Sequence, residues 1–502
     1  MSEAVGIVAA GFAAGALLDR SRRRALWGLA AIALGAALLA GDQWDSSQIE
    51  ALRESPGLAA LLGLAGVALV GALAWLFLRL PVAFPAAVVL ALPFRVPLEL
   101  GGETANLLVP LYVVVLAGTV ALFIRAARDR SGTRPEEDRP APGRWAGAMV
   151  PLLALSVTLY AVGIIWSGDP SRGLQDLCFF LIPFAVLFAL LTEVEWDRRT
   201  LRIVFVLLVA QALVCAAIGF GQYMTRELFW NEAVIRSNDF HVYFRVNSLF
   251  WDPNLYGRYL ALVITVSVAV LAWAKERRTA LWIAAATLVL WLSLVTTFSQ
   301  SSFFALIAGL AAVIALRWSL RAVLAGIAAA AVAGVALLAI GGELVKLDLD
   351  RLNPQTGGRA DLVTGGLEMF GNRPIAGYGS GSFSLSFREE VAGPDAPVTE
   401  SHTEPITVAA EAGIVGLAVY LALIVSSLFV LLAGARSSMP GLGRTGQGER
   451  PERGPPVARA AVFAAYVGLV VHTVFYAGYL DDPATWVLLA IGYCLAFRCR
   501  AT

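Results

Sequence analysis

Residues 57–78 read GLAALLGLAGVALVGALAWLFL, a run of 22 residues that contains no charged side chain. A helix needs about 20 predominantly apolar residues to cross the hydrocarbon core of a bilayer, so this run predicts a membrane-spanning helix. The composition agrees, because 58% of the chain is apolar, the mean hydropathy is +0.72 and only 15% is charged. Soluble domains carry roughly 25% charged residues. These values exclude a soluble enzyme, a nucleic-acid-binding protein and a disordered scaffold.

Similar apolar runs recur along the whole chain and predict about 12 to 15 spans. Several runs are short, and for these we leave three alternatives open: a span with little tilt, a paired re-entrant element, or no span at all. They lie at about 4–18, 25–40, 57–78, 81–95, 106–124, 147–166, 174–192, 201–222, 255–274, 279–296, 303–317, 322–340, 405–430, 458–477 and 483–498. We therefore expect residues 1–502 to form a single transmembrane domain of the all-α class, a polytopic integral membrane helical bundle.

The charges between these runs are distributed unequally, which predicts the orientation in the membrane because cytoplasmic loops are enriched in Lys and Arg. Eight stretches, assigned to the cytoplasmic side, hold 26 of the 38 basic and 11 of the 37 acidic residues. They are residues 19–24, Arg79, 125–144, 193–202, 275–278, 317–321, 434–459 and the C-terminal Arg-Cys-Arg. The alternation holds from residue 125 to the end. We expect the C-terminus to be cytoplasmic, while the side of the N-terminus stays open.

Two segments on the predicted outer side are long, residues 223–254 and 341–404. A helical bundle needs only short connections, so long loops in a membrane protein usually carry function. The long inner segments, 128–144 and 436–456, are rich in Pro, Gly, Arg and Glu without apolar periodicity, which is typical of solvated linkers. We therefore expect the chemistry in the two outer loops.

The chain has only three histidines, and all fall toward the predicted outer side. His241 lies in the first outer loop and His472 in the outer part of its span, where a structural role is the more common one. His402 lies just before a span, with Glu400, Glu404 and Glu411 close in sequence. A neighbouring carboxylate orients an imidazole and raises its basicity, as general-base work requires. His402 is therefore the candidate base.

Several arginines also face the predicted outer side, which is otherwise acidic. Arg245 precedes a span, Arg258 lies one turn inside it, and Arg359 and Arg373 belong to the second loop. A planar guanidinium gives bidentate hydrogen bonds to phosphate where water is partly excluded. The alternative is that each arginine pairs with a loop carboxylate, such as Asp239, Asp252 or Asp361. Arginines in both loops, with His402 nearby in sequence, form the candidate site.

Other motifs are weaker. The run GYGSGSF contains Gly377, Gly379 and Gly381, which we interpret as a tight turn rather than a nucleotide site. Asp348 and Asp350 form a D-x-D pair, a pattern that holds a metal in some glycosyl-transfer enzymes, but two acids in a polar loop are weak grounds for a metal site. No Walker sequence appears, so no ATP site is expected.

The chain resembles the O-antigen ligase and O-antigen polymerase family over roughly residues 145–480. The segment RVNSLFWDPNLYGRYLAL (245–262) is similar to the family's Arg…PN stretch at the start of a span. The run GGRADLVTGGLEMFGNRPIAGYGSGSF (357–383), followed by SHTEPITVAAEAGIVGLAVYLALI (401–424), resembles its large outer loop. There an Arg, a P-x-x-G-x-G turn and a His precede an E-x-G-x-x-G helix start.

This resemblance implies a membrane-embedded glycosyltransferase of the C type, inverting and independent of metals and cofactors. The donor would be a glycan linked to undecaprenyl diphosphate, and the site would lie at the outer face of the bacterial cytoplasmic membrane. Carried over, Arg245 and Arg359 would bind the diphosphate and His402 would activate the acceptor hydroxyl. The turn FSQSSFF (298–304) lacks the arginine of many members, and Thr403 replaces their Asn. Arg172, Arg258 and Arg373 are the candidates to replace that arginine, and His241 and Glu404 are the reserve bases.

The main alternative is a transporter or flippase for lipid-linked glycans, which would also have many spans. Transporters usually show internal repeats and charged residues near the membrane midplane. The sequence shows no convincing repeat, and the spans are nearly free of charge. A structural or assembly protein is the third possibility, against which the His and Arg residues argue mildly. The acceptor, either a glycan, a glycolipid or a protein, stays open.

Overall fold

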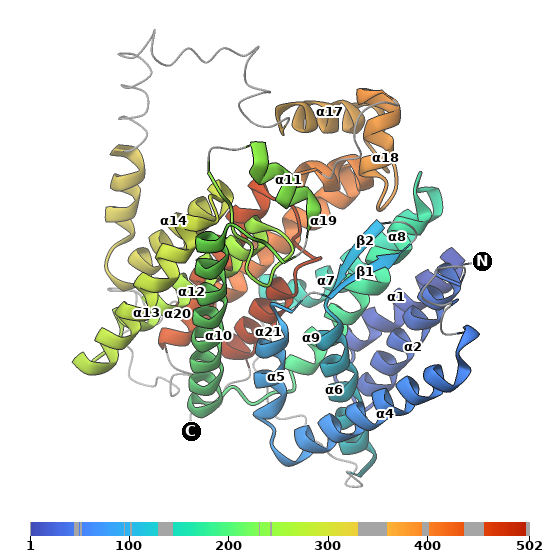
Figure 1. The fold of residues 1–502 in the computed structure, drawn as a ribbon, viewed down its shortest axis with the longest axis horizontal. Coiled ribbons are helices and arrows are strands. Elements are labelled where there is room, and N and C mark those ends of the chain that lie inside the picture. Colours follow the sequence, from blue (N-terminus) through green and yellow to red (C-terminus); the bar gives the residue numbers. More distant parts are fainter. Residues whose placement is uncertain are drawn as a thin grey trace.

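The computed structural model describes residues 2–44, 50, 53–94, 96–100, 103–128, 144–229, 231–240, 243–329, 359–393, 401–435 and 456–497. This part of the chain is a helical bundle (Figure 1). Eleven of its helices are long and apolar enough to cross a membrane. Three shorter apolar helices accompany them, Ser2–Leu18, Leu320–Ala329 and Pro483–Phe497. The expected fold class, an all-α polytopic membrane bundle, is confirmed.

The helices that enter the description below are named in chain order. They are α1 (Ser2–Leu18), α2 (Arg24–Asp42), α4 (Pro56–Arg79), α5 (Ala83–Ala91), α6 (Val109–Arg128), α7 (Arg144–Gly163), α8 (Pro170–Asp176), α9 (Ile182–Leu191), α10 (Arg198–Thr225), α11 (Glu232–Phe240), α12 (Pro253–Ala272), α13 (Arg277–Thr296), α14 (Gln300–Arg317), α17 (Arg359–Asn372), α18 (Phe383–Phe387), α19 (Glu404–Ala435), α20 (Pro456–Phe475) and α21 (Pro483–Phe497). A 3₁₀ turn (Ile164–Trp166) extends α7, and π-helical turns join α8 to α9 (Leu177–Leu181) and extend α18 (Arg388–Ala392).

One short hairpin interrupts the helices. Strand β1 (Val96–Leu100) pairs antiparallel with β2 (Glu103–Leu107), in the register Val96 opposite Leu107. The span prediction passed over this hairpin, because it fell between the runs at 81–95 and 106–124. The sequence signal was the Gly-Gly pair between two five-residue runs, a common hairpin connection.

An Asp-Pro pair starts three of the helices. Asp169, Asp252 and Asp482 precede the first prolines of α8, α12 and α21. Each aspartate accepts a backbone N–H of the first turn, at 3.0 Å for Asp169, 2.6 Å for Asp252 and 2.8 Å for Asp482. Proline is tolerated at the first position of a helix because the backbone N–H that it lacks would have no acceptor within the helix. These caps fix where each helix begins.

Small residues let the central helices approach one another closely, as is common between helices in membranes. A Cβ on Gly309 of α14 would lie 2.6 Å from Thr265 Oγ1 of α12. A Cβ on Gly468 of α20 would lie 2.8 Å from the carbonyl oxygen of Ala305 in α14. Helices α12, α14 and α20 therefore form one tightly packed group, and this group carries part of the candidate site.

The outermost helices expose apolar side chains. On α4, Leu64 is 70% and Val67 is 73% exposed, and Trp282 of α13 is 70% exposed. A soluble protein would not leave apolar faces of this size in water, and lipid is their natural environment. The chain is a multi-pass membrane protein.

The turn between α1 and α2 lies beside the end of α9. Arg24 forms an ion pair with Glu193 at 2.6 Å, which brings two stretches assigned to the cytoplasmic side, 19–24 and 193–202, to the same end of the bundle. At the other end of α2, Asp42 accepts a hydrogen bond from Ser171 of α8 at 3.0 Å. Helix α1 therefore starts at the end where α8 starts, so the structure supplies the relative orientation that the charge count left open.

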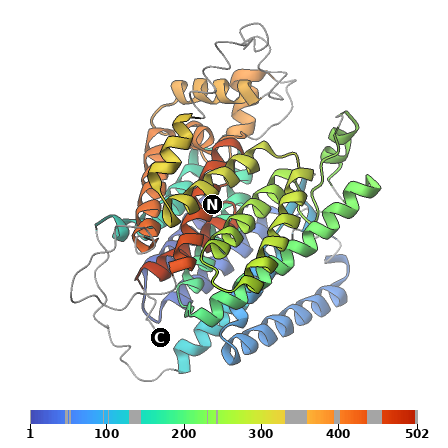
Figure 2. The same cartoon turned by 90° about the vertical axis from the view of Figure 1, so that its left-hand side faces the viewer.

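The two long segments that the charge distribution predicts to be outer contain helices of their own. Helix α11 lies within residues 223–254, while α17 and α18 lie within residues 341–404. Figures 1 and 2 show α17 lying crosswise over one end of the bundle. Residues 330–358 and 394–400 lie outside the described residues, and with them most of the span expected at 322–340.

Candidate active site

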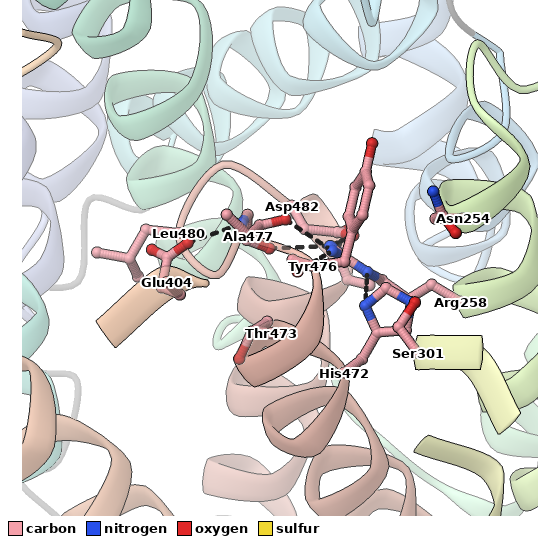
Figure 3. A network of polar contacts seen from close by, with 12 residues as sticks. Asn254, Arg258, Ser301, Glu404, His472, Thr473, Tyr476, Ala477, Leu480 and Asp482 are labelled. Atoms are coloured by element: carbon pink, nitrogen blue, oxygen red, sulfur yellow. Dashed lines mark hydrogen bonds and ion pairs between the residues drawn. The ribbon is translucent and has the colours of Figure 1, made fainter. Parts of the chain in front are cut away.

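Arg258 is the most deeply buried arginine of the described chain, with 2% of its surface exposed. Its Nε–H is donated to His472 Nδ1 at 3.1 Å. One terminal nitrogen donates to Asp482 Oδ2 at 2.6 Å and to the Gly478 carbonyl at 2.9 Å. The other donates to the carbonyls of Tyr476 at 3.1 Å and Ala477 at 2.9 Å. All five N–H groups are engaged (Figure 3), so Arg258 has none left for a diphosphate.

His472 of α20 is fully buried and its ring is held in one tautomer. Because a guanidinium can only donate, Nδ1 must carry a lone pair, and the ring proton of this neutral imidazole lies on Nε2. Nε2 faces Ser301 Oγ and Ser302 Oγ of α14, each at 3.2 Å. Ser299 joins the same group, 2.7 Å from Ser302 Oγ. His472 is thus a structural link between α12, α14 and α20.

The loop at residues 476–482, between α20 and α21, is anchored on several sides besides Arg258. Glu404, the first residue of α19, accepts the Gly478 N–H at 2.7 Å. The Tyr479 hydroxyl forms a 2.6 Å hydrogen bond with Tyr466 of α20. Burial raises the pKa of Tyr479 well above its usual range, so this phenol stays protonated. Such anchoring fixes the backbone that carries Tyr476.

Tyr476 brings His402 into the same site. The Tyr476 ring lies 5.6 Å from the His402 ring, centroid to centroid, with 30° between the planes. The same tyrosine ring lies 5.9 Å from the His472 ring and 5.9 Å from the guanidinium carbon of Arg258. Figure 3 shows its hydroxyl pointing away from the Arg258–His472 pair. His402 is partly exposed and precedes α19 by two residues.

Arg245 lies in the segment before α12 and is half-buried. Its backbone N–H and carbonyl are both paired with the Asn238 side chain of α11, at 3.0 Å each. Its Nε donates to the Thr297 carbonyl and one terminal nitrogen donates to Asn254 Oδ1, also at 3.0 Å each. Two of five N–H groups are therefore used within the described part of the chain, and the guanidinium is held in place with donors to spare.

Arg359 is the first residue of α17 and is also half-buried. Helix α17 packs over the first turn of α19, where a Cβ on Gly366 would collide with Ile406. Neither Arg359 nor Arg245 forms an ion pair with a carboxylate among the residues that the structure describes. Of the expected alternative, pairing with Asp252 or Asp361 does not occur there, while the side chain of Asp239 lies outside the description.

A continuous series of contacts joins Arg245 to His402. Arg245 donates to the side-chain oxygen of Asn254. The backbone carbonyl of Asn254 accepts a hydrogen bond from the Ser302 hydroxyl at 3.4 Å. Ser302 contacts His472, and the His472 and Tyr476 rings meet edge to face. Tyr476 then contacts His402. The structure thus joins Arg245 to His402, and Glu404 holds the loop that carries Tyr476. Arg359 is not part of this series, and it lies on α17, which packs over the first turn of α19.

The other candidates lie apart from this series or outside the described residues. Arg172 pairs with Asp176 at 3.5 Å in α8, and the Arg373 guanidinium lies 4.3 Å from the Tyr378 ring. Arg172 and Arg373 both border the turn formed by Gly377, Gly379 and Gly381, which is described below. His241, Asp348 and Asp350 lie outside the described residues. Among the described residues no group of three or more His, Cys, Asp or Glu side chains is arranged to hold a metal ion.

The expected tight turn at the three glycines is confirmed. Gly377, Gly379 and Gly381 have φ values of +68°, +94° and +77°, a region that other residues enter with strain. A Cβ on Gly381 would lie 2.6 Å from the Gly173 backbone nitrogen, and one on Gly379 would collide with the Ser167 backbone. The turn therefore fills the space beside the start of α8, and only glycine fits it.

This turn is tied to a break inside α19. Gly413 has φ +60° and ψ −159°, which is not helical. The Gly379 N–H is donated to the Glu411 carbonyl at 2.8 Å, and the Ile414 N–H is donated to the Pro374 carbonyl at 2.8 Å. The Glu411 carboxylate accepts the Phe383 N–H at 3.0 Å. The run E-x-G in α19 thus accommodates the turn, which sets the position of the helix that follows His402.

Residues 285–421 match the model of the O-antigen ligase family. This segment belongs to the O-antigen ligase family. The O-antigen ligase segment runs from α13 into α19 and includes the Ser299–Ser302 turn, Arg359, the glycine turn and His402. The resemblance seen in the sequence is confirmed there, and the match indicates an enzyme that transfers glycans. A comparison with curated proteins finds no match.

Sequence reasoning missed part of this site. Tyr476 and Asp482 were not singled out, and His472 was judged structural without a partner. Tyr476 and Asp482 lie after the O-antigen ligase segment, in the loop that Arg258 holds. The Asp-Pro pair at 482–483 was the one available signal, since it marks the start of α21. Nothing in the sequence marked Tyr476.

Proposed function

We propose that this protein transfers a glycan from an undecaprenyl-diphosphate carrier to a hydroxyl group of a glycan or glycolipid acceptor. The observation that carries the proposal is that Arg245 and Arg359 are half-buried and have no carboxylate partner among the described residues. By contrast, the buried Arg24 and Arg258 are each paired with a carboxylate. An anionic ligand such as diphosphate is the natural partner of the first two.

The mechanism is a single displacement. The acceptor oxygen attacks the anomeric carbon, and the bond from that carbon to the diphosphate oxygen breaks. The electron pair leaves with the diphosphate, and the proton of the attacking hydroxyl passes to His402. Arg245 and Arg359 stabilise the charge that develops on the leaving group. One displacement inverts the anomeric configuration, and the activated donor makes ATP and a metal ion unnecessary.

The lipid tail of the donor explains why this site lies at one end of a membrane bundle. We place that end at the outer face of the bacterial cytoplasmic membrane, supported by the excess of Lys and Arg in the segments at the opposite end. There the polar head of the carrier meets the arginines while its apolar tail stays among the helices.

The test uses purified protein in nanodiscs with the undecaprenyl-diphosphate-linked glycan of the host and its acceptor. We expect transfer with inverted anomeric configuration, measured by NMR of the product, and full activity in EDTA. The variant Asp348→Asn/Asp350→Asn should keep most of the activity. Retained configuration, or loss in EDTA that magnesium or manganese restores, would refute the mechanism. Deleting the gene in the host then separates the acceptors, because shorter polymers indicate a polymerase and unattached polymers of normal length indicate a ligase.

A further inference from the structure

We propose that Tyr476 is a positioning residue for His402, and that Arg258 exerts its effect on the site through this tyrosine. The inference rests on the proposed function of His402 as the base. It adds a residue outside the O-antigen ligase segment, which ends at residue 421. The carrying observation is the contact between the two rings, 5.6 Å apart and 30° from parallel.

The orientation of the His402 ring matters because a general base must direct one ring nitrogen at the hydroxyl it deprotonates. His402 lies two residues before α19, in a turn where the Thr403 N–H is donated to Ser401 Oγ at 3.1 Å, and its side chain is partly exposed. An imidazole has several staggered rotamers, and they direct its ring nitrogens differently. A flat aromatic ring against one face of the imidazole removes the rotamers that would cross it. The base is then oriented before the acceptor binds. Such orientation raises kcat and leaves the affinity for the donor nearly unchanged.

Tyr476 can act in this way because it is itself fixed. Its carbonyl accepts from Arg258 at 3.1 Å, and its N–H is donated to the His472 carbonyl at 2.9 Å. The guanidinium carbon of Arg258 lies 5.9 Å from the centroid of the Tyr476 ring. The loop behind it is held by Glu404, only two residues from His402, so the tyrosine and the histidine are tied to the same point. Figure 3 shows the Tyr476 side chain extending away from this network.

The decisive experiment compares Tyr476→Leu and Tyr476→Phe in nanodiscs. The chain has three histidines, so selective ¹³C labelling of the imidazoles gives three resonances, which single His→Gln variants assign. Losing the tyrosine ring removes its ring current from His402. We expect Tyr476→Leu to shift the His402 resonance and to lower kcat on the order of 10-fold while the donor Kd changes less than about 2-fold. Tyr476→Phe keeps the ring and should restore both readouts.

Phe475→Leu is the matched control. Phe475 precedes Tyr476 and stacks on Phe304 at 4.9 Å instead, so this variant should leave the His402 resonance and kcat unchanged. If Tyr476→Leu does not fold, as judged by thermal melting, Tyr476→Met keeps bulk and replaces it. An unshifted His402 resonance overturns the inference whatever the activity. So does a wild-type kcat in Tyr476→Leu when His402→Ala is inactive. A wild-type rate in His402→Ala instead refutes the proposed base, and the shift of the resonance then still reports the ring contact.

Discussion

The Nε–H of Arg258 is donated to Nδ1 of His472 across 3.1 Å, and this contact defines the role of both side chains. It fixes the histidine as the Nε2–H tautomer, which therefore cannot take a proton at Nδ1 without losing the arginine. It also completes the five hydrogen bonds of the guanidinium. Both residues are thereby assigned to holding the site together rather than to the reaction.

Arg24 repeats this arrangement at the opposite end of the bundle. It is 5% exposed, pairs with Glu193, and donates to the carbonyls of Ala16 at 2.9 Å and Leu17 at 3.2 Å. In both places a buried arginine joins loop carbonyls to one carboxylate. Within a membrane, carbonyls at helix ends lack water as a partner, and a guanidinium supplies several donors at once.

The first prediction concerns this buried charge. Asp482→Ala should leave the Arg258 guanidinium without its counter-charge and destabilise the protein by about 3–5 kcal/mol. Arg258→Lys should also be unstable, since one ammonium has three donors for five acceptors. Thermal melting in detergent measures both. The exposed pair Arg236–Glu232 of α11 is the control, and Glu232→Ala should leave the melting temperature unchanged. Equal melting temperatures of Asp482→Ala and the wild-type protein would contradict the anchoring role of the Arg258–Asp482 pair.

The second prediction concerns Arg245 and Arg359, the two arginines proposed to bind the donor. Arg245→Lys and Arg359→Lys should weaken donor binding and slow transfer on the order of 10²–10³-fold, because an ammonium lacks the planar fork. Arg236→Gln, in the same outer segment as Arg245, should have no effect. Binding is measured with the lipid-diphosphate donor in nanodiscs. Lysine variants with wild-type donor affinity would show that the diphosphate binds elsewhere.

The third prediction contrasts two histidines at the same site. His402→Ala should lower kcat by about 10²–10⁴-fold with donor affinity nearly intact and a wild-type melting temperature. His472→Ala should instead lower the melting temperature, because the buried Nε–H of Arg258 loses its acceptor. Rate, donor affinity and melting are measured on the same preparations. A stable His472→Ala protein together with an active His402→Ala protein would reverse the two assignments.

The fourth prediction concerns topology. In a variant freed of the native cysteines, cysteines at Gln355 and at Glu3 should react with a membrane-impermeant reagent in intact cells, whereas one at Gly441 should not. The charge distribution predicts the first and the last. The second follows from the structure, because α1 starts at the same end as α8. Labelling at Gly441 with protection at Gln355 would move the candidate site to the cytoplasmic side.

The sequence alone determined the features that depend on local composition. Uncharged runs of membrane-spanning length specified the helices, the arrangement of Lys and Arg predicted the sides, and three glycines specified a turn with positive φ. His402 was marked because it stands among carboxylates ahead of a span. Each of these signals lies within a short window of the chain, where spacing and residue type suffice.

The tertiary structure alone decided which arginines have all their N–H groups engaged. Arg245 and Arg258 are 13 positions apart in one motif, yet the first keeps donors to spare among the described residues and the second has none. The partners of Arg258 lie more than 200 residues away, in α20 and the loop after it. The tyrosine against His402 comes from that same loop. Whether a charge is neutralised depends on neighbours in space, and the close packing of distant helices supplied those neighbours here.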